Sequence, residues 1–284
     1  MKPYIQLMRI HLSIAIAFSA MTGYLLSARH IDAKAFVVFI AVFLLSGAAS
    51  AFNQYQERRR DALMERTRNR PLPTGSLSES GAILFAIVIG LIGFFLLLYL
   101  SVIAALLGLF NLAWYNLIYT PLKTRTTFAV IIGAITGVVP PVIGWTSAGA
   151  AISSPSLIFI AVFMFLWQIP HFVILLMKYG EEYKKAGFKI ITNKLNEIDS
   201  RVIVFIWIIS TTVCSMFFPL FHLITNTPLI YILLIINILI ITLFYRILFI
   251  KSNNHNINNQ ALILINAYQL FFFSLLLLNT YLFI

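Results

Sequence analysis

Long apolar runs, separated by short polar or glycine- and proline-containing breaks, make up most of this 284-residue sequence. A helix needs about 20 apolar residues to cross a hydrocarbon core of ~30 Å, and the runs have about this length. The pattern therefore predicts an all-α, polytopic membrane protein, with nine transmembrane helices bundled into a single domain over residues 1–284. The expected spans are 8–28, 35–55, 82–100, 102–119, 126–147, 156–177, 202–222, 228–249 and 261–283.

Composition supports a membrane protein and excludes a soluble one. Hydrophobic residues make up 61% of the chain and charged residues only 10%, whereas soluble domains carry about 25% charge. The net charge of +11 does not indicate nucleic-acid binding, because the basic residues lie between the apolar spans, where they orient a membrane protein. The single cysteine, Cys214, excludes an intrachain disulfide.

The basic residues also predict the orientation of the chain. Every lysine and arginine except Arg29 and Lys34 lies at or before the start of the first expected span, or close to or beyond the end of an even-numbered one. Since Lys and Arg accumulate on the cytoplasmic side, the amino terminus is predicted to be cytoplasmic and the carboxyl terminus outside. The two longest connections, 56–81 and 178–201, then share the cytoplasmic face, and we expect them to form short helices capping a cavity.

The most polar stretch of the chain, residues 53–73, follows an apolar run directly and holds six arginines and three acidic residues. Asn53, Glu57 and Asp61 are four residues apart, so they share one face if the preceding helix continues through them. Such oxygen ligands suit Mg²⁺ bound with a diphosphate, whose remaining oxygens Arg66 and Arg70 would hold. A solvated loop laced with salt bridges explains the same spacing equally well.

A second polar group, residues 119–125, follows the fourth span and contains Tyr119, Lys123 and Arg125. Lys123 and Arg125 would place positive charge on a diphosphate leaving group, although cations at this position more often anchor a span at the interface. The glycines and paired prolines of residues 133–145 allow close helix approach and bending. We expect this segment to form the wall of a cavity.

The sixth span carries Trp167, Gln168 and His171, and polar groups inside a membrane are costly without partners. Gln168 and His171 are three residues apart and so share a face, although a lone buried histidine is more often a packing residue. Glu181 and Glu182 follow on the cytoplasmic side as a second acidic group for a second cation. A helix would point these neighbours about 100° apart, so we expect only one of them to serve.

Four segments resemble, in the same order, motifs of the UbiA-type intramembrane prenyltransferases, specifically the haem-farnesylating branch of that family. The segments are 53–73 with its Met-Glu-Arg-Thr-Arg-Asn-Arg-Pro run, 119–123, Pro-Pro-Val-Ile-Gly-Trp at 140–145 and Trp-Gln-Ile-Pro-His-Phe at 167–172. The chain departs from the family pattern at Glu57, where aspartate is usual, and at Arg59, where many members have another acid. The metal site is therefore expected to be one carboxylate poorer.

The resemblance implies transfer of a farnesyl group from farnesyl diphosphate to a vinyl group of haem b, giving haem O for haem-copper oxidase assembly, with Mg²⁺ and within the bacterial inner membrane. By position, Asn53, Glu57 and Asp61 match the first metal and diphosphate motif, and Glu181 or Glu182 lies where the second is expected. We infer that Trp167, Gln168 and His171 recognise the porphyrin, with His171 near the iron. Contact with haem A synthase or with oxidase assembly is a further expectation.

Three other functions compete with this interpretation. A prenyltransferase for another aromatic or quinone-precursor acceptor would keep the metal motifs but would not need residues 167–171. A transporter or channel would line a path through the bilayer, whereas the polar groups here concentrate on one face. An assembly factor that only holds haem would need His171 but not the 53–61 motif.

Overall fold

The computed structural model describes residues 2–193, 195–250 and 256–282, and it assigns helices and turns but no strand to them. Nine helices in this part of the chain are long and apolar enough to cross a membrane, which confirms the nine predicted spans. Lys194 and Lys251, both assigned to cytoplasmic loops, and residue 283 of the last expected span lie outside the described residues. The chain divides into two compact units.

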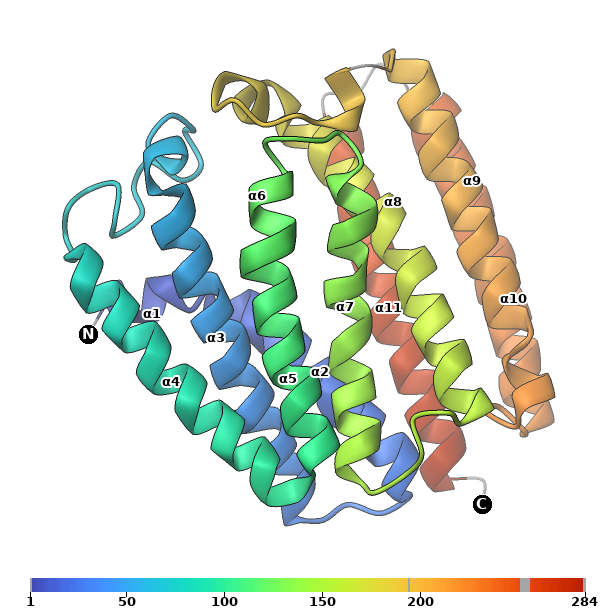
Figure 1. Ribbon diagram of the computed structural model, residues 1–284. Helices are drawn as coiled ribbons and strands as arrows, with labels where there is room; N and C mark the ends of the chain where they lie inside the picture. Colours follow the sequence, from blue (N-terminus) through green and yellow to red (C-terminus); the bar gives the residue numbers. More distant parts are fainter. Residues whose placement is uncertain (1, 194, 251–255, 283–284) are drawn as a thin grey trace. The chain divides into compact units, whose positions relative to one another are not determined.

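The first unit contains Met1–Ile152 and Glu181–Lys189. Helix α3 packs against α2 and α4, and α7 packs against α2 and α5 (Figure 1). The helices and turns of this unit are α1 (Lys2–Leu7), α2 (Ile10–Ala28), α3 (Ala33–Asp61), α4 (Glu79–Leu100), α5 (Val102–Ala113), η1 (Trp114–Tyr119), α6 (Thr120–Leu122) and α7 (Ala129–Ser147).

Small residues set the spacing of α2 and α7. A Cβ atom on Gly23 would collide with the backbone of Pro141, and one on Gly144 would collide with the backbone of Ala20. The two helices can therefore approach until their backbones touch, as the glycines of 133–145 led us to expect.

Side-chain caps begin the helices that carry the functional residues. The Asp32 carboxylate accepts a hydrogen bond from the Ala35 amide at the start of α3, and Ser78 does the same for α4. At its other end α3 continues to Asp61, six residues beyond the predicted end of that span, so the 53–61 motif is helical. Residues 62–78 then form turns.

The expectation of short helices in the two long connections is therefore wrong for residues 56–81, where α3 takes the first part and turns take most of the rest. Between residues 178 and 201, α8 (Pro155–Lys185) takes the first part, and one short 3₁₀ helix, η2 (Ile191–Asn193), follows. Proline and the small polar residues of 71–78 favour turns over helix, because proline lacks the amide that helices need.

A π-helical segment, η1, connects α5 to α6 just before Pro121. Pro121 has no amide to donate within the helix, and π-turns often occur where the regular bonding pattern is interrupted. The change in pitch follows Asn111 and precedes Lys123. It thereby sets the direction in which Tyr119, Thr120 and Lys123 project.

The second unit contains Ser153–Gly180 and Ile190–Ile284. It includes most of α8, then η2, α9 (Glu197–Met216), η3 (Phe218–Phe221), α10 (Thr227–Tyr245), η4 (Arg246–Ile250) and α11 (Ile257–Leu282). Phe163 of α8 stacks on Phe272 of α11 at 3.9 Å between ring centroids. A buried network of Ser215, Asn237 and Tyr268 joins α9, α10 and α11.

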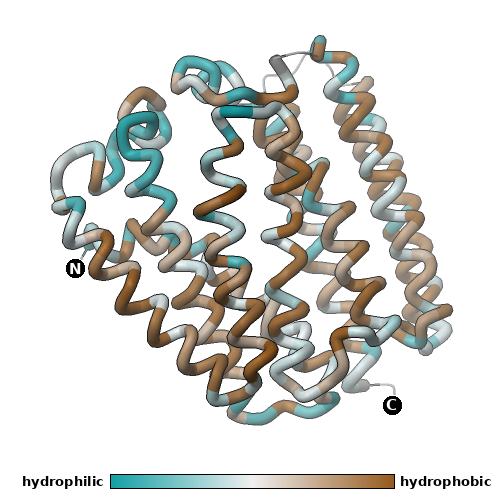
Figure 2. The backbone as a smooth tube through the Cα atoms, viewed as in Figure 1, coloured by the Kyte–Doolittle hydropathy of each residue, from teal (hydrophilic) through white to brown (hydrophobic). Residues whose placement is uncertain are grey.

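In both units the hydropathy of the residues changes from the middle of a helix toward its ends (Figure 2). Apolar residues predominate along the helices, and hydrophilic residues are most frequent toward the helix ends and in the turns. In the first unit, the end of α3, the turns of 62–78 and the segment 181–189 form the most hydrophilic end. The candidate site lies at that end.

Candidate active site

One face of α3 carries the three oxygen-bearing residues that the sequence singled out. Asn53, Glu57 and Asp61 are 2%, 7% and 1% exposed, so all three are buried although they lie in the most charged part of the chain. Four-residue spacing in a continuous helix places them along one stripe. The alternative of a solvated loop is excluded for these three residues.

Lys123 forms an ion pair with the middle residue of that stripe. Its ammonium lies 2.5 Å from Glu57 Oε1, without the geometry of a hydrogen bond. The ammonium also lies 5.1 Å from the centroid of the Tyr119 ring and 5.7 Å from that of Phe188. Burial is the largest single influence on Lys123 and lowers its pKa, but Glu57, Tyr115 and Tyr119 together raise it by more. The lysine pKa therefore stands above its ordinary value and the side chain is protonated.

Arg70 makes the equivalent contact with Asp61. Its Nη1 lies 2.7 Å from Asp61 Oδ2, and the Thr67 hydroxyl donates to the Asp61 backbone carbonyl at 2.8 Å. The other carboxylate oxygen, Asp61 Oδ1, is buried and accepts no hydrogen bond from the described residues. A buried acceptor without a donor is costly, and a cation is one kind of partner that would satisfy this oxygen. We call Glu57, Asp61, Lys123 and Arg70 the carboxylate cluster.

Asn53 is fixed by a residue that the sequence analysis missed. Its Nδ2 donates to Thr120 Oγ1 at 3.0 Å, and the Thr120 hydroxyl in turn donates to the Tyr115 carbonyl at 2.9 Å. Thr120 is buried at the junction of η1 and α6. With its amide nitrogen held as a donor, Asn53 has its side-chain oxygen left to act as an acceptor. The sequence did contain a signal for this role, because Thr120 is a polar residue directly after Tyr119 in the second polar group.

The segment 181–189 is joined to the turns after α3. Glu182 accepts a hydrogen bond from the Arg66 amide at 3.2 Å, and Arg66 Nη2 donates to the Tyr183 hydroxyl at 3.0 Å. The backbone amide of Lys189 donates to the Lys123 carbonyl at 2.9 Å. The structure thus brings Glu182 and Arg66 together, while Glu181 is exposed to solvent.

Two members of the second polar group differ in position. Tyr119 packs against α7, where its ring fills the space that a Cβ atom on Gly133 would occupy. Arg125 is exposed in the loop after α6, and no ion pair of the described residues includes it. Lys123 therefore belongs to the carboxylate cluster, whereas Arg125 is not brought into it.

A largely apolar pocket opens along the same face of α3, on the side toward the N-terminus of that helix. It encloses about 580 Å³ including its open mouth. Ser46 and Ser50 of α3 line it, seven and three residues before Asn53, and a helix rises only about 1.5 Å per residue. The other lining residues are Leu12, Ile16, Val42, Leu45, Ala49, Gly108, Asn111, Leu112, Tyr115, Thr136 and Ile143.

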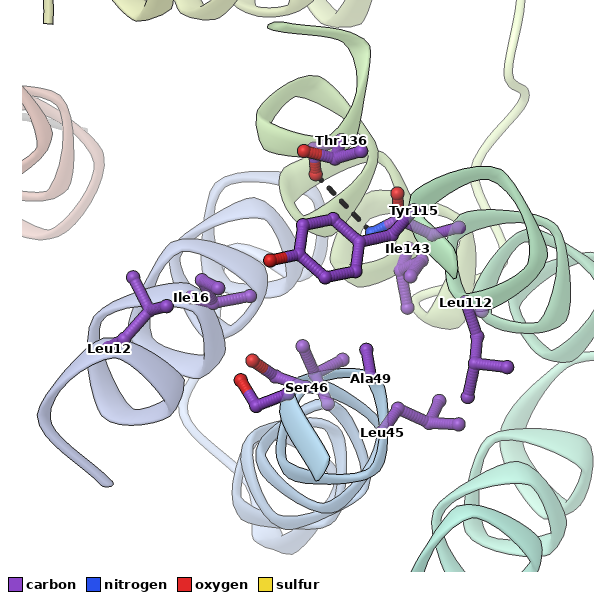
Figure 3. Close-up of a pocket in the computed structure, with 13 residues that line it drawn as sticks. Leu12, Ile16, Leu45, Ser46, Ala49, Leu112, Tyr115, Thr136 and Ile143 are labelled. Atoms are coloured by element: carbon purple, nitrogen blue, oxygen red, sulfur yellow. Dashed lines mark hydrogen bonds between the residues drawn. The ribbon is translucent and has the colours of Figure 1, made fainter. Parts of the chain in front are cut away.

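The pocket lies between five helical segments of the first unit, α2, α3, α5, η1 and α7. Figure 3 shows the Tyr115 ring of η1 across the space from Ser46 and Ala49 of α3, with Leu12 and Ile16 of α2 at one side. Thr136 and Ile143 of α7 close another side, which confirms for these two residues that the segment 133–145 forms a cavity wall. Sequence analysis did not identify Ser46, Ser50 and Tyr115, although the serines continue the stripe of Asn53.

The three residues of the sixth span lie in the second unit. Trp167 is buried and its indole N–H donates to the Ile265 carbonyl of α11 at 2.9 Å. His171 stacks on Trp167 with ring centroids 4.9 Å apart, and its Nδ1 is buried without a hydrogen bond from the described residues. Gln168 is half-buried. These residues form a local group within the second unit.

The donor set of the first unit fits a hard cation. Among the described residues, no three His, Cys, Asp or Glu side chains gather in the manner of a closed protein metal site. One amide oxygen and two carboxylates, with Asp61 Oδ1 unpaired, instead match Mg²⁺, which keeps several waters and shares its coordination with a phosphate ligand.

Comparison with known proteins gives concordant results. Residues 16–276 match the model of the UbiA prenyltransferase family. Protoheme IX farnesyltransferase of Geobacter sulfurreducens is 37% identical over 76% of this chain and 80% of its own length. The protein of the same name from Nitratidesulfovibrio vulgaris is also 37% identical, over 63% of each chain. The alignment thus covers slightly less than two thirds of this second relative.

Solved structures share the fold at lower identity. A structure of digeranylgeranylglyceryl phosphate synthase has a TM-score of 0.77 at 17% identity and covers 98% of both chains. A UbiA homologue from Archaeoglobus fulgidus, bound to GPP and Mg²⁺, has a TM-score of 0.69 at 17% identity, covering 96% of this chain and 99% of its own. The chain therefore belongs to the UbiA prenyltransferase family and is a multi-pass membrane protein.

Proposed function

We propose that this prenyltransferase transfers a farnesyl group from farnesyl diphosphate to a vinyl group of haem b, giving haem O. The relatives that carry the name protoheme IX farnesyltransferase support both substrates. The resemblance of residues 167–172 to the haem-farnesylating branch supports haem as the acceptor over a quinone precursor.

The observation that carries the proposal is the continuity of one face of α3. Asn53, Glu57 and Asp61 form its polar end, and Ser50, Ser46 and Val42 continue it into the pocket. An allylic diphosphate has the same two parts, a highly charged head and an apolar tail. Bound along this face, the head would contact the carboxylate cluster while the tail enters the pocket.

Mg²⁺, when bound by Asn53, Glu57 and Asp61, would neutralise diphosphate oxygens and so make the diphosphate a better leaving group. Lys123 and Arg70 would hold further oxygens of the same group, where negative charge develops. Exposed Arg66 and Arg125 would add positive charge at the mouth of the site. Glu182 would stabilise the Arg66 turn or coordinate a second ion.

In the reaction, the farnesyl group moves from the diphosphate oxygen to a vinyl carbon of haem b. The bond between C1 and oxygen of farnesyl diphosphate breaks, and diphosphate leaves with the electron pair. The π electrons of the haem vinyl group attack the allylic cation to form the new carbon–carbon bond. Water adds to the resulting cation and loses a proton, which leaves a hydroxyethyl group. The apolar pocket and the rings of Tyr115 and Tyr119 would protect the allylic cation from early hydration.

The acceptor would be recognised by the local group in the second unit, with Trp167 and Gln168 against the porphyrin and His171 near the iron. The unpaired, buried Nδ1 of His171 supports this role, because an unsatisfied polar atom in a membrane span is costly unless it serves a ligand. We expect His171→Ala to lose haem turnover while farnesyl diphosphate still binds. Equal haem kinetics in His171→Ala and in His11→Ala, a variant of an exposed histidine, would contradict the role.

The proposed location is the bacterial inner membrane, with the amino terminus in the cytoplasm and the carboxyl terminus outside. The alternation of lysine and arginine between loops supports this orientation. Diphosphate release would then take place on the cytoplasmic side. The apolar product would pass to haem A synthase or to oxidase assembly by contact within the membrane.

A single incubation tests the proposed function. Purified protein in detergent is mixed with haem b, farnesyl diphosphate and Mg²⁺, and the porphyrin is analysed by mass spectrometry. We expect the porphyrin to gain the mass of one farnesyl group and one hydroxyl group. The Asp61→Ala variant is the inactive control. An unchanged porphyrin, with transfer to a quinone precursor under the same conditions, would favour the alternative acceptor.

A further inference from the structure

The four side chains of the carboxylate cluster balance one another in charge. Glu57 and Asp61 are its two acids, and Lys123 and Arg70 contact them at 2.5 and 2.7 Å. Both acids are almost fully buried, and the side chains of Lys123 and Arg70 are only 15% and 19% exposed. A divalent cation that approaches this cluster alone meets two carboxylates whose charge is already compensated.

Lys123 is held in this position from several sides. The rings of Tyr119 and Phe188 flank its ammonium, and the Lys189 amide fixes its backbone carbonyl. Its ammonium contacts the Glu57 carboxylate, whose oxygens a metal ion would use. A dication bound to Glu57 would stand close to this ammonium, and like charges at short range in a buried site repel strongly.

A diphosphate changes the charge balance of the cluster, because it brings negative charge and oxygen atoms that accept hydrogen bonds. Its oxygens offer Lys123 and Arg70 new partners, which releases Glu57 and Asp61 to a cation. Binding of the anion and binding of the cation should then favour each other, and by linkage the effect is reciprocal.

We propose that Lys123 acts as a built-in counter-cation that blocks Glu57, so that the divalent cation binds tightly only together with a diphosphate. The inference rests on the proposed function, since it concerns the same site. It assigns Lys123 a role before the reaction begins: the lysine couples metal binding to the arrival of the substrate head group.

Manganese binding, read by electron paramagnetic resonance, tests the proposal without turnover. We expect the full-length wild-type protein to bind Mn²⁺ weakly alone and about tenfold or more tightly with inorganic diphosphate. Lys123→Met should bind Mn²⁺ alone about tenfold more tightly than wild type does, and should lose most of the gain from diphosphate. Lys123→Arg, which keeps the cation, should behave like wild type.

Lys185→Met is the matched control, because it removes an exposed lysine side chain from the same region and should leave Mn²⁺ binding unchanged. If Lys123→Met and wild type bind Mn²⁺ alone equally, while diphosphate still strengthens binding to wild type, the counter-cation role is wrong and the proposed function stands. If wild type binds no Mn²⁺ even with diphosphate, the metal-dependent site and the counter-cation role both fail. A thermal unfolding midpoint for each variant checks that it is folded.

Discussion

Two buried polar groups, one in each unit, differ in charge and in how completely their hydrogen bonds are satisfied. The carboxylate cluster of the first unit is charged, and Asp61 Oδ1 remains without a hydrogen bond from the described residues. The network of the second unit is neutral and closed: Tyr268 donates to Asn237, Asn237 donates to Ser215, and Ser215 donates to the Thr212 carbonyl.

The difference follows from what each group must do. Neutral hydrogen bonds between helices cost little to bury once every donor has an acceptor, so they fix the register of α9, α10 and α11. Buried ion pairs cost more to desolvate and are a poor route to stability. Ion pairs with an acceptor left unpaired therefore suit a candidate ligand site better than a purely structural role.

The largest loss of activity is expected for a substitution of Asp61. Asp61→Ala removes both the Arg70 partner and the unpaired oxygen, so turnover should fall about a thousandfold or more. Farnesyl transfer to haem b, followed by mass spectrometry with saturating Mg²⁺, measures this. Glu65→Ala, which changes an exposed carboxylate of the same region, should remain active. An Asp61→Ala variant with wild-type turnover would remove Asp61 from the site.

A smaller effect is expected in the pocket. Ala49→Phe places a ring in the space between α3 and Tyr115, so the KM for farnesyl diphosphate should rise about tenfold, which equals about 1.4 kcal/mol of lost tail binding. Binding of inorganic diphosphate should not change, because the carboxylate cluster is untouched. Ile40→Phe puts the same ring on the exposed side of α3 and serves as control. Equal KM values in the two variants would place the tail elsewhere.

A substitution in the neutral network should lower the stability of the protein but leave its turnover unchanged, whereas a substitution in the carboxylate cluster should lower turnover. Tyr268→Phe deletes the hydroxyl that donates to Asn237, leaving a buried oxygen with one donor fewer, at a cost of about 1 kcal/mol in stability. Turnover per folded molecule should stay at the wild-type value. Thermal unfolding in detergent measures the loss, and Tyr231→Phe, at an exposed tyrosine of α10, is the control. A large loss of turnover would show that the network is not merely structural.

The smallest effect is expected at the cap of α3. Burial raises the pKa of Asp32, but the Tyr24 hydroxyl at 2.9 Å, the Ala35 amide and His30 lower it by more, so the pKa lies below its ordinary value. Asp32→Ala should therefore cost about 0.5 kcal/mol near neutral pH. A lowered folded-state pKa stabilises above the unfolded value and loses that effect as pH falls, so wild type and variant should converge below about pH 4. A difference between their unfolding midpoints that is independent of pH would contradict this.

Particular residues show how far sequence alone could lead. The four-residue spacing of Asn53, Glu57 and Asp61 was sufficient to predict a shared face, because helix geometry is local. The pairing of Lys123 with Glu57 and of Arg70 with Asp61 was not predictable in that way. Thr120 was overlooked because a threonine near a helix start has many ordinary uses. Its contact with Asn53 spans 67 positions in the chain.

The sequence by itself determined the membrane fold, the nine spans and the candidate stripe on α3, since apolar length and helical period are local properties of the chain. Tertiary structure decided which cation neutralises which carboxylate and where the pocket opens. It also decided that Glu182 accepts from the Arg66 amide while Glu181 faces solvent. These features depend on side chains distant in sequence meeting in a packed bundle, and no local pattern encodes such distances.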